Sequence, residues 1–170
     1  DGEGVRTTLF VSGCSHHCEN CFQPKTWSFS YGQEFTTDIA DEVLATLDDF
    51  FVDGLTFLGG EPMEPENQHG LLELAKRAKA LHPEKSIWCY TGDVYEDLVD
   101  AASPRHTEET DELLGLIDVL VDGPYIDSLH DITLRFRGSS NQRVIDMNET
   151  RKTGEVVLWK DEEGYSTHSM

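Results

Sequence analysis

The sequence has few basic residues and no long hydrophobic run, and both absences narrow its function. Only 13 lysines and arginines stand against 33 aspartates and glutamates, giving a formal net charge of −20. Such a chain offers no basic stripe to a phosphate backbone, so we expect no nucleic-acid binding. No stretch approaches 18 consecutive apolar residues, and the first residues lack the pattern of a signal peptide. We therefore expect no membrane association and a cytoplasmic location.

Cysteine is scarce and unevenly placed. The chain has four cysteines, and three of them fall within eight positions. It has no G-x-S-x-G nucleophile elbow and no constellation of serine, histidine and aspartate that suggests a catalytic triad. The cysteines are therefore the residues on which the chemistry of this protein is expected to depend.

The cysteine loop, residues 13–24 (GCSHHCENCFQP), carries Cys14, Cys18 and Cys21 in a C-x3-C-x2-C pattern. A disulfide framework does not fit, because the expected compartment is reducing and three thiols leave one unpaired. Three thiolates on a tight loop suit a 4Fe–4S cluster with one iron left free of protein ligands. Such an iron can coordinate a substrate or a cofactor.

Two other readings of the cysteines stay open at this stage. A structural zinc would need a fourth ligand, and His16 or His17 could supply it only with strain, because both lie between cysteines already at ligand spacing. We interpret both histidines as residues that shape the loop. Cys89, in the apolar run SIWCY, is interpreted as a buried small hydrophobic residue and not as a fourth ligand.

The hydrophobic pattern alternates between short apolar runs and helical periods. Apolar runs predict strands at 6–11, 54–60, 86–92 and 118–123. Apolar residues at helical spacing predict helices within 36–51, 70–83, 94–100 and 107–116. In the first helix we expect Thr37 as the N-cap and Phe50 on the buried face, and in the second Leu81 on the buried face. Beyond residue 123 the pattern weakens, to a turn and short strand within 135–146 and a strand at 154–159.

This alternation is typical of an α/β protein with a mostly parallel sheet covered by helices. Four or five βα units are too few for a closed eight-unit barrel, so we expect a partial, open (β/α) barrel. We expect one domain over residues 1–159 and a flexible C-terminal tail over 160–170. The expected strand ends carry the segments GC, GGEP, TGD and DGPY, and these should meet at one rim of the sheet.

The cysteine loop after a first strand, followed by Gly-Gly-Glu-Pro at the end of a second, resembles the radical S-adenosylmethionine superfamily. Within it, the segments DGEGVRTTLFVSGC, GLTFLGGEPMEPEN, DVLVDGPY and RFRGSSNQR resemble activating proteins of glycyl-radical enzymes, above all those of anaerobic ribonucleotide reductases. The resemblance covers most of residues 1–145. Two positions differ: Asn20 stands where the superfamily often has an aromatic residue, and Asp-Gly-Glu-Gly replaces the usual Asp-Gly-Pro-Gly.

The resemblance implies that Cys14, Cys18 and Cys21 hold a 4Fe–4S cluster whose open iron takes the amino and carboxylate groups of S-adenosylmethionine. One electron, from a donor such as flavodoxin or ferredoxin, then cleaves the sulfonium to methionine and a 5′-deoxyadenosyl radical. That radical removes a hydrogen from a glycine of the partner, anaerobic ribonucleoside-triphosphate reductase. The cofactor carries this chemistry, so no side-chain acid or base is required.

The resemblance and the strand-end positions also suggest a cofactor-binding set. Its expected members are Asn20, Gly59, Gly60, Glu61, Pro62, Thr91, Asp122 and Asn141. The two glycines would let the backbone approach the methionine part, and Glu61 would pair with its amino group. Thr91 and Asp122 fit turn formation or helix capping equally well. Asn141, between Arg137 and Arg143, would contact the cofactor or order its loop, and surface salt bridges remain an alternative for the arginines.

Alternative functions share the first two motifs. They are an activase of a pyruvate formate-lyase-type enzyme, a small-molecule radical enzyme such as a deazaguanine synthase, and a zinc-binding interaction module without catalytic activity.

Overall fold

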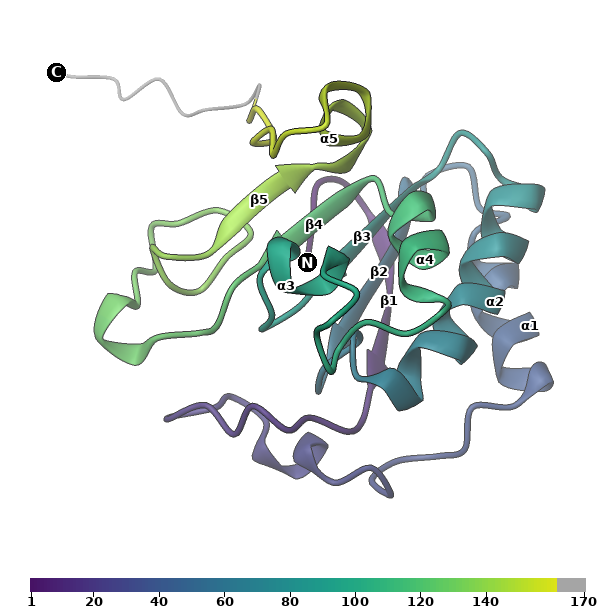
Figure 1. Cartoon of the computed structure of the whole chain (residues 1–170). Helices are drawn as coiled ribbons and strands as arrows, with labels where there is room; N and C mark the ends of the chain where they lie inside the picture. The colour runs from purple at the N-terminus through teal and green to yellow at the C-terminus, as the bar shows by residue number, and fades with distance from the viewer. Residues whose placement is uncertain (162–170) are drawn as a thin grey trace, which may run out of the picture.

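The computed structural model describes residues 1–161 and builds them around one five-stranded sheet (Figure 1). The strands are β1 (Arg6–Val11), β2 (Gly54–Gly59), β3 (Ser86–Tyr90), β4 (Val119–Asp122) and β5 (Arg143–Asp146). They lie in the order β1-β2-β3-β4-β5, and the first four are parallel. Only β5 is antiparallel, with Asp122 opposite Arg143. The expected α/β class with a mostly parallel, open sheet is confirmed.

The connections between the parallel strands supply the helices. These are α1 (Thr37–Thr46), α2 (Pro65–Leu81), α3 (Tyr95–Val99), α4 (Thr110–Leu116) and α5 (Met147–Thr153), with 3-10 turns η1 (Pro24–Trp27) and η2 (Asp127–Leu129). Helices α1, α2 and α4 lie together on one side of the sheet (Figure 1). A doubly wound sheet reverses its strand order and has helices on both faces, and this sheet does neither over β1 to β4.

The period-two alternation of the strands divides the core between the two faces of the sheet. On the helix side, Phe57, Cys89 and Leu120 are fully buried in the main cluster with residues of α1, α2 and α4. On the other side, Trp88 and Val121 form a smaller cluster. Consequently Cys89 is a core residue with no exposed surface, and burial raises the pKa of its thiol well above the ordinary value.

The two long helices differ from their predicted boundaries. The N-cap of α1 is Thr36 and not Thr37, because the Thr36 hydroxyl accepts a hydrogen bond from the Ile39 amide at 3.4 Å. The prediction for Phe50 was wrong: α1 ends at Thr46, and Phe50 lies in the following turn with 96% of its surface exposed. Leu81, the last residue of α2, is also 59% exposed.

Helix α2 begins five residues earlier than predicted, at Pro65. Proline is favoured at the first helical position because its missing amide would have no partner there. The polar segment that follows gave no hydrophobic period, yet Gln68 in it is fully buried and bonded on both sides.

The C-terminal part departs most from prediction. The strand expected at 154–159 forms only an isolated bridge between Ile145 and Leu158, and of the 135–146 segment only Arg143–Asp146 is a strand. Between them lies α5, which the hydrophobic pattern did not show. Asp146 caps it by accepting from the Glu149 amide at 2.9 Å, and Gly154 ends it in a left-handed conformation. The hydrophobic pattern did not predict this helix because only two of its residues, Met147 and Thr150, are buried.

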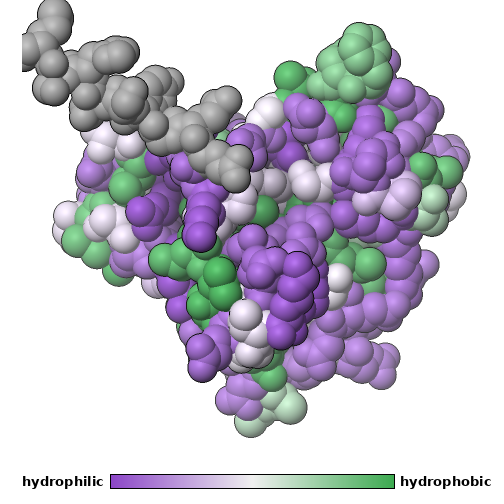
Figure 2. Space-filling view, turned by 90° about the horizontal axis from the view of Figure 1, so that it is seen from above, coloured by the Kyte–Doolittle hydropathy of each residue, from purple (hydrophilic) through white to green (hydrophobic). Residues whose placement is uncertain are grey.

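The surface agrees with the composition. The face in Figure 2 is mostly hydrophilic, with separate hydrophobic patches between the polar side chains. Over the part of the chain that the structure describes, no helix has the length and apolar character needed to cross a bilayer. The flexible tail predicted for 160–170 lies, from residue 162 on, outside the described residues.

Candidate functional site

The cysteine loop leaves the carboxyl end of β1 and doubles back on itself. His17 and Asn20 adopt positive φ angles of 50° and 55°, which reverse the chain between the cysteines. The Cys21 amide donates to the Cys18 carbonyl at 3.2 Å. Asparagine is one of the few residues that tolerates this conformation, which gives Asn20 a structural reason for its position.

The three loop cysteines are free thiols. Cys14 is buried, whereas Cys18 and Cys21 are partly exposed. Their three Sγ atoms do not all lie within 4.8 Å of one another. A tetrahedral zinc with bonds of about 2.3 Å would need sulfur atoms about 3.8 Å apart. Three thiolates on one short loop are a donor set that a 4Fe–4S cluster uses, so these residues fit that group.

The end of β2 presses directly against the base of the cysteine loop. The Gly60 amide donates to the Val11 carbonyl and the Glu61 amide to the Gly13 carbonyl, both at 2.8 Å. A Cβ at Gly60 would lie 2.7 Å from the Gly13 carbonyl oxygen, and one at Gly59 would lie 2.4 Å from that of Val11. The two glycines therefore allow the end of β2 to pack closely against the end of β1 and the cysteine loop. An additional approach to a cofactor stays a prediction.

The Glu61 side chain is buried at the end of β2, with 1% of its surface exposed, and it contacts three segments of the chain. One carboxylate oxygen accepts from the Gly92 amide at 2.7 Å and contacts His16 Nε2 at 2.8 Å, and the other accepts from the Met63 amide at 2.8 Å. Glu61 thus joins the cysteine loop, its own loop and the turn after β3. These partners differ from the expected role, in which the carboxylate faces the amino group of a ligand.

His16 lies between two carboxylates, those of Glu61 and Asp93. Its Nε2 lies 3.6 Å from Asp93 Oδ1, in addition to its contact with Glu61. The carboxylates of Asp93 and Glu61 raise the pKa of His16 to about 10, so the ring is a cation at neutral pH. His16, Glu61 and Asp93 lie close enough to suggest a metal site, but the ion pairs among them account for their proximity.

Two further predicted residues, Thr91 and Asp122, lie at the ends of β3 and β4. Thr91 is 5% exposed, and its hydroxyl accepts from the Asp93 amide at 3.1 Å. Asp122 is fully buried, accepts from the Tyr95 amide at 2.8 Å at the start of α3, and pairs with Arg143. Asp122 therefore caps the start of α3, which is the alternative that the sequence left open.

Asn141 keeps an unused acceptor. Its side-chain amide donates to the Pro124 carbonyl at 2.7 Å, while its buried Oδ1 has no hydrogen-bond partner within residues 1–161. Arg137 donates to the carbonyl oxygens of Ser140 and Gln142, so it orders the loop that presents Asn141. The orphaned oxygen marks Asn141 as the residue of this loop best placed to receive a hydrogen bond from a ligand.

Sequence analysis missed three charged residues beside the rim: Glu64, Asp93 and Arg105. Glu64 stands two residues after the GGEP segment, and Asp93 is the last residue of the TGD segment, so their places beside the expected strand ends were the signal available. Arg105 lies in the irregular segment between α3 and α4, where no motif pointed to it. All three side chains are less than 15% exposed, and Arg105 forms ion pairs with both Glu64 and Asp93.

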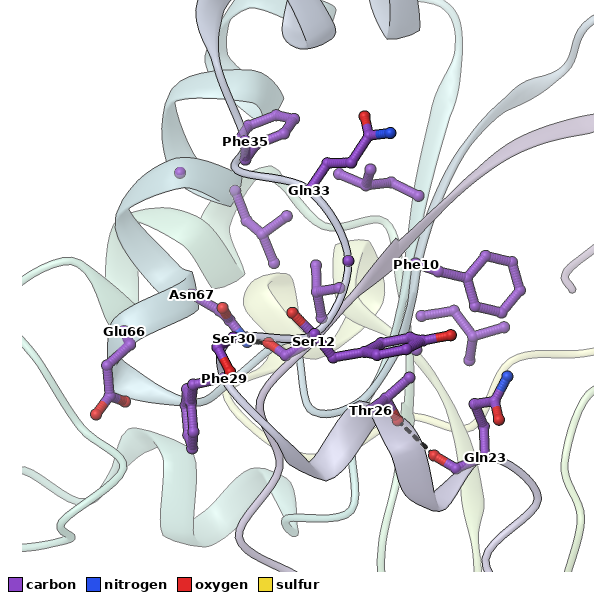
Figure 3. Close-up of a pocket in the computed structure, with 18 of the residues that line it drawn as sticks. Phe10, Ser12, Gln23, Thr26, Phe29, Ser30, Gln33, Phe35, Glu66 and Asn67 are labelled. Atoms are coloured by element: carbon purple, nitrogen blue, oxygen red, sulfur yellow. Dashed lines mark hydrogen bonds between the residues drawn. The ribbon is translucent and has the colours of Figure 1, made fainter.

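A cavity of about 1240 Å³ borders the cysteine loop at Cys21 (Figure 3). It lies along β1 beneath the segment that follows the loop, and aromatic side chains from both line it, among them Phe10, Phe29 and Phe35. Phe10 is 61% exposed and Phe29 is 51% exposed. An open cavity with several aromatic side chains in its wall therefore reaches one predicted cluster ligand, Cys21, along the edge strand of the sheet.

Comparisons with known proteins show the family of this chain. Residues 1–145 match a family described as a 4Fe-4S single cluster domain. The chain is 42% identical over 144 residues to the anaerobic ribonucleoside-triphosphate reductase-activating protein of Vibrio cholerae, covering 84% of this chain and 88% of the relative. The proteins of the same name from Escherichia coli K12 and enterobacteria phage T4 are 39% identical over 146 residues and 38% identical over 144. These matches cover 85% of this chain in both cases, and 90% and 85% of the respective relatives.

No solved structure matches the chain. The family resemblance found in the sequence is confirmed, and the chain belongs to the family of anaerobic ribonucleoside-triphosphate reductase-activating proteins.

Proposed function

We propose that this protein is a radical S-adenosylmethionine activase that generates a glycyl radical on anaerobic ribonucleoside-triphosphate reductase. The observation that carries the proposal is the set of three free thiols in the loop after β1, while the fourth cysteine, Cys89, is fully buried in the core. The family membership supports the identity of the partner.

In this proposal Cys14, Cys18 and Cys21 hold a 4Fe–4S cluster. When bound, the cluster supplies the electron that cleaves S-adenosylmethionine to methionine and a radical able to take a hydrogen from glycine. The protein contributes the position of the ligands and an opening for the partner. Cys89 takes no part, because its thiol lies within the core on the helix side of the sheet.

The cofactor-binding set is narrower than the sequence alone suggested. We assign to it the main chain of residues 59–62, Thr91 at the end of β3, and Asn141 with its unused acceptor. Asn20 stays in the set as the residue at the turn between the second and third cysteines. Glu61 acts mainly by holding the rim together, and Asp122 is left out because its carboxylate is buried under Arg143.

The fold supports an entry route for a protein substrate. We propose that the sheet is the wall of a partial, open (β/α) barrel, since its parallel strands follow sequence order with helices on one side. Residues 1–159 then form one radical S-adenosylmethionine domain. The cavity along β1 gives a peptide loop of the reductase lateral access to the cluster (Figure 3). A soluble donor such as flavodoxin or ferredoxin would supply the electron in the cytoplasm.

The test is formation of the glycyl radical. The protein is reconstituted with iron and sulfide without oxygen, reduced, and mixed with S-adenosylmethionine and the reductase of the same organism. We expect a glycine-centred doublet in the electron paramagnetic resonance spectrum, and none with a Cys18→Ala variant. A doublet with a formate-lyase-type enzyme only would assign the protein to that activase. Consumption of a small substrate without any protein partner would refute activase function.

A further inference from the structure

Arg105 contacts three segments of the rim through one side chain. Its Nη2 donates to the Ser15 hydroxyl at 2.8 Å, and its Nε lies 3.1 Å from Asp93 Oδ2. Its Nη1 pairs with Glu64. These partners belong to the cysteine loop, the turn after β3 and the segment after β2. The Arg105 side chain is 14% exposed; its contact with Asp93 is partly buried, whereas its bond to Ser15 is exposed.

Ser15 is held from two directions by this arrangement. Its amide donates to Glu64 Oε1 at 2.6 Å, while its hydroxyl accepts from Arg105. The Glu64 side chain is 5% exposed and stands at the N-cap of α2. Because Ser15 directly follows Cys14, the side chains of Glu64 and Arg105 add to the main-chain bond from Glu61 to Gly13 in holding the first cysteine of the loop near the start of α2.

The main chain at Arg105 is itself anchored. Its carbonyl accepts from Gln68 Nε2 at 2.8 Å, and Gln68 also accepts from the Thr110 hydroxyl at 2.6 Å. Gln68 is fully buried in α2, and Thr110 begins α4. Arg105 therefore reaches the cysteine loop from a base tied to two core helices, and it is not carried along by movements of the loop.

The charges explain why an arginine occupies this position. Arg105 is the charge partner of two carboxylates with little exposed surface, that of Glu64 at 5% and that of Asp93 at 11%. Buried carboxylates are stable only when paired, so removal of Arg105 would leave Glu64 and Asp93 poorly compensated. A guanidinium offers five donors in a fixed plane and serves three partners together, which a lysine amine on a single flexible stem does less well.

We infer that Arg105 is a positioning residue of the metal site: together with Glu64 it holds Cys14 in its ligand position before any cluster is bound. The inference rests on the proposed function only in taking Cys14 as a cluster ligand. It does not depend on the identity of the substrate or of the partner.

The test is hydrogen exchange, followed by mass spectrometry, on the full chain prepared without iron. In Arg105→Met we expect amide exchange in residues 13–24 to rise about tenfold or more, because hydrogen bonds to charged groups are lost there. Rates in the core strands should change much less. The matched control is Arg77→Met, which removes an exposed ion pair with Asp41 and should leave the cysteine loop unchanged.

Two further variants keep the inference open to refutation if Arg105→Met does not fold. Arg105→Lys keeps the charge and should raise exchange in the cysteine loop by a smaller factor, and Ser15→Ala removes only the hydroxyl contact and should do likewise. Unchanged protection of the loop in the variants that fold would overturn the inference, as would an equal rise in every segment. A wild-type protein that forms no glycyl radical, yet shows the local effect, would refute the proposed function and support this inference.

Discussion

Replacement of Gly60 by alanine tests how tightly the end of β2 and the cysteine loop are joined. An ideal Cβ at this position lies 2.7 Å from the Gly13 carbonyl oxygen and 2.9 Å from that of Thr26. Both are main-chain atoms in hydrogen-bonded segments, since the Gly13 amide donates to the same Thr26 carbonyl at 2.8 Å. Neither atom can yield by rotating a side chain, so the methyl group must push the cysteine loop away.

The size of the effect follows from these contacts. Overpacking a tight site costs about 1–3 kcal/mol. The displacement also weakens the bonds from Gly60 to Val11 and from Glu61 to Gly13, each of which contributes about 1 kcal/mol net. Because the two effects overlap, we expect a total loss of about 2–4 kcal/mol of unfolding free energy. Gly115→Ala is the matched control: it has no atom within 4 Å in α4, and alanine there should stabilise by about 0.5–1 kcal/mol.

The assay is urea unfolding of the iron-free variants, followed by iron analysis after reconstitution. Gly60→Ala should unfold at lower urea and bind less iron per chain, because Gly13 precedes the first ligand. Wild-type stability and full iron content in this variant would refute the packing argument. Loss of S-adenosylmethionine affinity with both properties intact would return Gly60 to the role expected from sequence, a close approach to the cofactor.

Three further results are expected. Alanine at any of the three loop cysteines should abolish cluster binding in iron analysis, while Cys89→Ala should keep full iron and lose about 1 kcal/mol of stability from a small cavity. Arg143→Met should cost about 3 kcal/mol in urea unfolding, because it leaves the fully buried Asp122 unpaired, with iron content unchanged; wild-type stability would contradict the pairing. Burial raises the pKa of Tyr90, so its neutral form stabilises the fold below pH 10 and this contribution is lost as pH rises. Above pH 10 the wild type should therefore lose about 1.4 kcal/mol per pH unit relative to Tyr90→Phe, and parallel curves for the two proteins would refute this.

The parts of the fold with strong hydrophobic periods could be predicted from sequence. Strands β2, β3 and β4 are short apolar runs because both faces of the sheet are covered there, whereas β1 lies at the edge of the sheet and was predicted from its apolar and β-branched residues. Helix α5 and the early start of α2 could not be found this way. Their stability comes from caps and from buried polar side chains such as Gln68, which a hydrophobic pattern does not register.

The site residues likewise divide into those that local sequence patterns predict and those that depend on tertiary packing. The cysteine spacing and the strand-end glycines are local signals, so Cys14, Cys18 and Cys21 stood out at once. Arg105 acts on the cysteine loop from 90 positions away in sequence, through bonds that exist only after α2 and α4 are packed. Asp122 illustrates the opposite error: its place at a strand end suggested a ligand contact, but the facing Arg143 of β5 makes it part of the framework.

The most direct test of the central claim is the electron paramagnetic resonance spectrum of the reduced, reconstituted protein with and without S-adenosylmethionine. We predict the signal of one 4Fe–4S cluster per chain, altered when S-adenosylmethionine is added because the open iron gains a ligand. A cluster signal unaffected by S-adenosylmethionine, or a purified protein that holds zinc and assembles no cluster, would contradict the account.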